Sequence, residues 1–139
     1  MQLLDIIIGP DVYVNASVAL GSPPEKVVTR VLGRGKGVTK STRWILDRVK
    51  AMLAAHPNFK KEAVDAQVGI IEGLVTVVDD GGKFGPNDWE KALLAAAKSA
   101  GVHRIVTDHP DLAGKEATDG IEFFSTESWL VEAAMPPPP

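Results

Sequence analysis

Short apolar runs alternate with amphipathic stretches along the chain, and this alternation predicts strands separated by helices. The apolar runs are rich in β-branched residues and too short for ordinary helices, so they suit strands of a parallel sheet that is covered on both faces. We expect these strands at 3–8, 38–39, 74–78, 104–107 and 121–124. The order of elements predicts an α/β fold, a three-layer α/β/α sandwich with a central parallel sheet and right-handed crossovers.

Helix start signals mark the amphipathic stretches. Ser22 precedes Pro23 and stands three residues before Glu25, a capping-box pattern for a helix that ends at Gly33. Residues 11–20 have two interpretations, because 12–14 favour an extended chain whereas 16–20 could begin a helix. The other helices are expected at 42–55 after a Ser41 cap, at 59–72, from an Asn87 or Asp88 cap to 100, and after Ser125 or Thr126.

The chain length of 139 residues suits a single domain, expected at 1–134, with a proline-rich disordered tail at 135–139. Hydrophobic residues make up 45% and charged residues 24%, as in ordinary globular proteins, and no apolar run is long enough to cross a membrane. The lack of cysteine excludes disulfides and thiolate chemistry. Together with the absence of a secretory signal, it favours a cytoplasmic location.

Positive charge is concentrated in residues 26–50. This basic band has eight basic residues and one acid, so it carries +7 while the rest carries −10, against a net charge of −3. Such a band could follow a phosphate backbone, and the alternative is an ordinary solvated surface. The residues predicted to contact RNA are Arg34, Lys36, Lys40 and Arg43.

Candidate chemistry lies in the polar turn after the strand at 104–107. Asp108, His109 and Asp111 fall within four positions there. Ligands of α/β domains bind at the carboxyl ends of the strands, so this turn is the first candidate for metal or acid–base chemistry. Asp79 and Asp80 also follow a strand, where a metal role competes with the commoner roles in capping and turns.

Several segments resemble PIN domains, a family of metal-dependent ribonucleases that includes the VapC-type toxins. Residues 105–112, Ile-Val-Thr-Asp-His-Pro-Asp-Leu, are similar to the family's Val-Thr-Gly-Asp-x-Asp-Leu motif. Further similarity lies in the opening strand and acidic motif (6–16), the following loop (21–24), the alanine-rich helix (94–101) and the closing strand and helix (121–130). The resemblance implies carboxylates that hold Mg²⁺ or Mn²⁺ for phosphodiester hydrolysis.

The family's acidic positions are displaced or replaced here. They fall on Gly9, Arg48, Glu90 and His109, with Asp111 at the accessory acid, and neighbouring acids are Asp11, Asp47, Asp88 and Asp108. In one interpretation the metal site is degenerate and holds no cofactor, because Arg48 repels a divalent cation. In the other, small register shifts rebuild a site for Mg²⁺ or Mn²⁺, and His109 favours Mn²⁺.

We predict a PIN-like protein related to toxin-type endoribonucleases that binds RNA with weakened or lost nuclease activity. If it cleaves RNA, the resemblance implies catalytic roles for Asp11, Asp88, Asp108 and Asp111, and metal ligation by Asp11, Asp108, His109 and Asp111. The predicted partners are RNA, an antitoxin protein and a second copy of the chain, with no membrane. The alternative is a non-catalytic module for protein interaction or dimerisation on a PIN-like scaffold.

Overall fold

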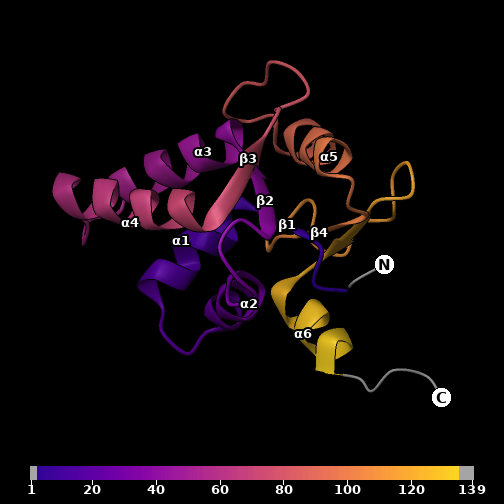
Figure 1. The fold of residues 1–139 in the computed structure, drawn as a ribbon, viewed down its shortest axis with the longest axis horizontal. Helices are drawn as coiled ribbons and strands as arrows, with labels where there is room; N and C mark the ends of the chain where they lie inside the picture. Colours follow the sequence, from indigo (N-terminus) through magenta and orange to yellow (C-terminus); the bar gives the residue numbers. More distant parts are fainter. Residues whose placement is uncertain (1–2, 135–139) are drawn as a thin grey trace.

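The strands of this protein lie parallel to one another between layers of helices. The structure is a computed structural model that describes residues 3–134, so the predicted tail at 135–139 lies outside the described residues. In Figure 1, α5 (Trp89–Ala100) lies above the strands, and α2 (Pro23–Leu32) and α6 (Thr126–Ala134) lie below them. The predicted α/β architecture with parallel strands is confirmed.

The strands form two hydrogen-bonded sets in residues 3–134, where one central sheet was expected. One set has the order β1 (Ile7–Ile8), β4 (Arg104–Val106) and β5 (Glu122–Phe124), and the other pairs β2 (Thr39–Thr42) with β3 (Val75–Val78). All pairs are parallel, with Ile8 opposite Val106 at the end of β1. β1 is short because Pro10 begins a helix at once, and this leaves little strand to pair with β2.

The first helix begins earlier than its residue types indicate. α1 (Pro10–Val18) includes Val12 and Val14, so the prediction of an extended chain at 12–14 is wrong. Proline suits the first position of a helix. An acid in the first turn, here Asp11, interacts favourably with the positive end of the helix dipole. Val12 and Val14 are buried, and their packing outweighs the preference of valine for strands.

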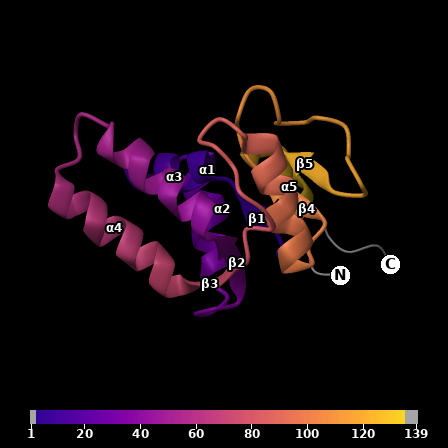
Figure 2. The ribbon, with the colours of Figure 1, turned by 90° about the horizontal axis from the view of Figure 1, so that it is seen from above.

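The next helices follow the predicted order, with one change of cap. Ser22 accepts a hydrogen bond from Glu25 N at 3.4 Å, as expected for the start of α2. Thr42, rather than Ser41, caps α3 (Arg43–Ala54), because β2 continues to Thr42. α3 and α4 (Lys61–Leu74) correspond to the helices expected at 42–55 and 59–72, and they form a helical hairpin that projects to the left in Figure 2.

α6 closes the fold against the start of the chain. Trp129 is fully buried, and its indole N–H donates to Leu3 O at 3.3 Å. The hydroxyl of Ser125 accepts from Ser128 N at 3.1 Å, so the first of the two predicted caps is the one used. Within residues 3–134, no helix is both long and apolar enough to span a bilayer.

Candidate functional site

The carboxyl end of β1 is closely packed around Gly9 and Asp11. A Cβ atom at Gly9 would lie 2.7 Å from Asp11 Oδ1 and 3.0 Å from Thr107 Cβ. The position at which the PIN family has its first acid therefore has no room for a side chain. The Asp11 carboxylate, which reaches back from the first turn of α1, fills this space instead.

Asp11, in the first turn of α1, accepts hydrogen bonds from the two residues that follow β4. The Thr107 hydroxyl donates to Asp11 Oδ1 at 2.7 Å, and Asp108 N donates to Asp11 Oδ2 at 2.7 Å. Both carboxylate oxygens are thus occupied, and Asp11 is only 9% exposed. The contacts make Asp11 a structural connection between α1 and the end of β4.

Asp108 continues this network to the last helix. Its two oxygens accept from Thr126 N and from the Thr126 hydroxyl, each at 2.8 Å. We call Asp11, Thr107, Asp108 and Thr126 the Asp11–Thr126 network. It fastens α1, β4 and α6 together at the carboxyl ends of the strands.

The environment of Asp11 predicts a pH dependence of stability. Burial raises the pKa of Asp11 above its ordinary value, against smaller lowering effects of the hydrogen bonds from Thr107 and Asp108. A raised pKa means that the folded protein holds the proton more tightly than the unfolded chain. The resulting stabilisation is complete below the unfolded-state pKa and is lost as pH rises through the folded-state pKa.

The measurement is the free energy of unfolding in urea from about pH 4 to pH 7 for the wild type and for Asp11→Asn, which does not titrate. We expect the free energy of unfolding of the wild type to fall relative to that of Asp11→Asn as pH rises. A difference that is constant, or that moves in the wild type's favour, would contradict the raised pKa.

A separate pocket of about 380 Å³ lies beside the network. Its lining residues are Asn87, Trp89, Glu90, His109, Asp111 and Leu112, and we call it the His109 pocket. The ring centroids of Trp89 and His109 lie 4.8 Å apart, and Trp89 also contacts Trp44 edge-on at 5.9 Å. Asp111 N donates to His109 Nδ1 at 3.2 Å, which helps to orient the imidazole ring.

The structure divides the four predicted metal ligands into two groups. Asp11 and Asp108 belong to the buried network, whereas His109 and Asp111 line the pocket. No three His, Asp or Glu side chains in residues 3–134 are grouped so that they could hold a metal ion. The residues present do not fit a Mg²⁺ or Mn²⁺ site, because two of the expected ligands, the Asp11 and Asp108 carboxylates, already accept hydrogen bonds from the protein.

The other acids after strands have local roles. Asp88 Oδ2 accepts from Gly85 N at 2.8 Å, so this predicted catalytic residue shapes the turn before α5. Asp80 Oδ1 accepts from Trp44 N at 3.0 Å and caps α3, and Asp79 Oδ1 accepts from Gly81 N at 2.7 Å. The capping and turn roles of Asp79 and Asp80 are confirmed. Glu90 forms an ion pair with Lys115 at 3.2 Å.

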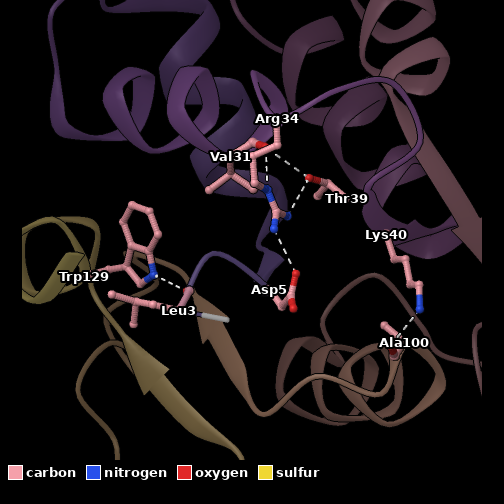
Figure 3. A network of polar contacts seen from close by, with 8 residues as sticks. All are labelled: Leu3, Asp5, Val31, Arg34, Thr39, Lys40, Ala100 and Trp129. Atoms are coloured by element: carbon pink, nitrogen blue, oxygen red, sulfur yellow. Dashed lines mark hydrogen bonds and ion pairs between the residues drawn. The ribbon is translucent and has the colours of Figure 1, made fainter. Parts of the chain in front are cut away.

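Two predicted RNA-binding side chains, Arg34 and Lys40, form contacts within the protein at the amino edge of the strands (Figure 3). Arg34 donates to Val31 O at 3.1 Å and forms an ion pair with Asp5 at 2.8 Å, and Lys40 donates to Ala100 O at 3.2 Å. Val31 and Ala100 lie in the last turns of α2 and α5, where a cation favours the negative end of the helix dipole. These cations stabilise helix ends at the amino edge, away from Asp11.

The other two predicted RNA-binding residues differ from each other. Arg43 forms an ion pair with Glu72 at 2.8 Å, and this contact raises the Arg43 pKa. Lys36 is exposed and forms no ion pair within residues 3–134. Of the four, only Lys36 offers a charge that is unengaged in the part of the chain described.

Sequence reasoning missed Thr107, Thr126 and Trp89. Thr107 and Thr126 are almost fully buried polar residues that hold the two carboxylates in place. A threonine directly after a buried strand, next to an acid, was the available signal for Thr107. Trp89 is half-buried in the first turn of α5 and borders the pocket.

Comparison with known proteins supports the fold. The sequence matches no protein-family model and no curated protein. Its structure is similar to a chain of VapBC2 from Rickettsia felis, solved with a DNA fragment from its promoter, with 11% identity over 86% of this chain and 97% of that chain and a TM-score of 0.60. It is also similar to Mycobacterium tuberculosis VapC20, a toxin that cleaves the sarcin-ricin loop, with 13% identity over 73% of this chain and 87% of that chain and a TM-score of 0.50. The PIN-like fold expected from the sequence is confirmed.

Proposed function

We propose that this protein is a PIN-like relative of toxin-type endoribonucleases that binds RNA and has weakened or lost metal-dependent cleavage. The observation that carries the proposal is the division of the acidic residues at the carboxyl edge. Asp11 and Asp108 use their oxygens within the network, and His109 and Asp111 remain at an open pocket beside it. This arrangement supports a ligand site at the pocket and argues against the carboxylate cluster that metal-dependent hydrolysis needs.

The similarity to VapBC2 and VapC20 supports an RNA ligand and an antitoxin-like protein partner for this chain. The location that fits these partners is the cytoplasm. Should cleavage be retained, Asp11, Asp88, Asp108 and Asp111 would be its catalytic residues, with Asp11, Asp108, His109 and Asp111 as ligands of Mg²⁺ or Mn²⁺. A metal bound only by the folded protein raises its melting temperature, so millimolar Mn²⁺ tests this set directly.

The deciding experiment combines binding and cleavage on the same labelled single-stranded RNA. Fluorescence anisotropy measures affinity at two salt concentrations, and gel electrophoresis measures cleavage with and without Mn²⁺. We expect salt-dependent binding, little or no cleavage and no rise in melting temperature with Mn²⁺. Rapid Mn²⁺-dependent cleavage that Asp11→Asn abolishes would refute the loss of activity, and an absence of binding would refute the RNA ligand.

The cations that RNA uses can be identified with two matched double variants. Arg30 and Lys36 are exposed and form no ion pair within residues 3–134, whereas Lys40 and Arg43 already contact Ala100 and Glu72. We expect Arg30→Ala with Lys36→Ala to reduce the slope of log affinity against log salt by about 1.4, which is about 0.7 for each charge removed from a single strand. Lys40→Ala with Arg43→Ala should change this slope less. If this second double variant changed the slope more than the first, RNA would bind on the Lys40 side of the basic band.

The second candidate is a module for protein interaction or dimerisation, and the exposed face of α4 favours it. Ile70 is 58% exposed on this helix, and Val77 is 40% exposed on β3, whose outer edge has no strand partner in residues 3–134. An unpaired edge and an exposed apolar side chain are features that partner chains cover. Sedimentation of the full chain at several concentrations distinguishes a monomer from a dimer.

Gly69 lies on the same helix and provides a stability prediction. A Cβ atom at Gly69 would meet nothing within 4 Å, so alanine fits without a clash. Because glycine in a helix interior is less favourable than alanine, Gly69→Ala should raise the free energy of unfolding of the monomer by about 1 kcal/mol in urea denaturation. A loss of stability that grows with protein concentration would instead show that another chain approaches α4 closely there.

A further inference from the structure

The His109 pocket combines aromatic rings with unused hydrogen-bonding groups. Trp89 and His109 pack against each other, with ring centroids 4.8 Å apart, and both contribute to its wall. The Asp111 carboxylate is exposed and accepts no hydrogen bond within residues 3–134. The two ring planes are tilted by 44°, so each ring offers its own face. A site with aromatic faces in its wall and a carboxylate at its rim suits a planar ligand that donates hydrogen bonds.

The charges around the pocket restrict the ligand further. Glu90 is neutralised by Lys115 at 3.2 Å, so Asp111 is the acid of this pocket with no cation beside it in residues 3–134. A phosphate would be repelled by Asp111, whereas a neutral ring with N–H groups would be attracted. The polar group facing this carboxylate is therefore expected to be the edge of a base rather than the backbone of a nucleic acid.

We propose that the His109 pocket binds a single unpaired guanine of the RNA, stacked against the Trp89–His109 pair. Guanine presents two adjacent N–H donors on its Watson–Crick edge, and these match the two oxygens of one carboxylate, here Asp111. Adenine, cytosine and uracil lack this pair of adjacent ring and amino donors. The inference rests on the proposed RNA-binding function and adds the position and identity of the base that is read.

The pocket volume agrees with this ligand. The pocket of about 380 Å³ lies at the lower end of the range for small-molecule sites, which suits one base but not a folded RNA element. Sequence-specific readers of RNA commonly bind bases of single strands, which they stack on aromatic rings and recognise by their edges. The remaining nucleotides would run outside the pocket and contact the protein through their backbone.

The test compares two labelled oligouridine hexamers, one with a single central guanosine and one with a central adenosine, by fluorescence anisotropy. Wild type is expected to bind the guanosine hexamer roughly tenfold more tightly. Asp111→Asn should remove this preference, so that the two hexamers bind with similar affinity. His109→Ala should weaken both complexes roughly fivefold or more, because stacking does not depend on base identity.

Matched controls separate the pocket from general effects on the surface. His103→Ala and Glu116→Gln change an exposed imidazole and an exposed carboxylate outside the pocket, and both should leave the preference intact. Melting temperatures of all variants verify that they are folded. RNA binding with no guanosine preference, and with no effect of His109→Ala, would overturn the pocket but retain the proposed function. Absence of RNA binding by the wild type would overturn both.

Discussion

Asp11→Ala is expected to lower the free energy of unfolding by about 2–3 kcal/mol at neutral pH, measured by urea denaturation. The substitution removes both acceptors from the Thr107 hydroxyl and from Asp108 N. Thr107 is fully buried, so its hydroxyl has no access to water as a replacement partner. Two donors then remain without an acceptor in a closely packed site, and such unsatisfied buried groups are costly.

Asp111→Ala is the matched control for this prediction. Asp111 is exposed and its carboxylate accepts no hydrogen bond in residues 3–134, so a change within about 0.5 kcal/mol is expected. Equal small effects at Asp11 and Asp111 would show that the Asp11–Thr126 network contributes little to stability. A wild-type melting temperature that rises with Mn²⁺, while that of Asp11→Ala does not, would restore the metal interpretation of Asp11.

Trp129→Ala should have the larger effect, a loss of about 3–5 kcal/mol in the free energy of unfolding. The indole is fully buried and donates to Leu3 O, so its removal leaves a cavity and an unpaired carbonyl between α6 and the start of the chain. The same helix begins at Thr126, which holds the Asp108 carboxylate. The Asp11–Thr126 network should therefore weaken together with the docking of α6.

Val131→Ala tests the other face of the same helix. Val131 is 67% exposed, and its truncation is expected to change the free energy of unfolding by no more than about 0.5 kcal/mol. Both variants are measured by urea denaturation, and their free energies of unfolding are obtained by the same linear extrapolation. If Trp129→Ala were as mild as Val131→Ala, α6 would be dispensable for stability and the network would not depend on its docking.

The alternation of apolar runs and amphipathic stretches was sufficient to predict most elements of the fold. Helix signals such as Ser22 and Pro23, and the left-handed Gly101 with φ 70° at the end of α5, act over a few residues, so they are visible in the chain itself. The exception is α1, where Val12 and Val14 suggested an extended chain. Their burial in a helix that packs against α2 and α3 decided the conformation, and burial depends on residues far away in the sequence.

The candidate site was predicted only in part. Asp11 and Asp108 were expected to meet because the carboxyl ends of parallel strands lie at one edge, and the structure brings them together. Their separation from His109 and Asp111 was not predictable. It depends on where Thr107 and Thr126 place their hydroxyl groups, and a one-position change along a strand reverses the face on which a side chain lies.

The amino-acid sequence alone determined the class of fold, the order of strands and helices, and the concentration of acids after the central strands, because these follow from local periodicity and from helix and turn signals. Only the tertiary structure decided which charges are available. It directs Arg34 and Lys40 to the ends of α2 and α5, and it closes the space at Gly9. Hydrogen bonds and close packing act between residues about a hundred or more positions apart, such as Asp11 and Asp108, and no pattern along the chain records such contacts.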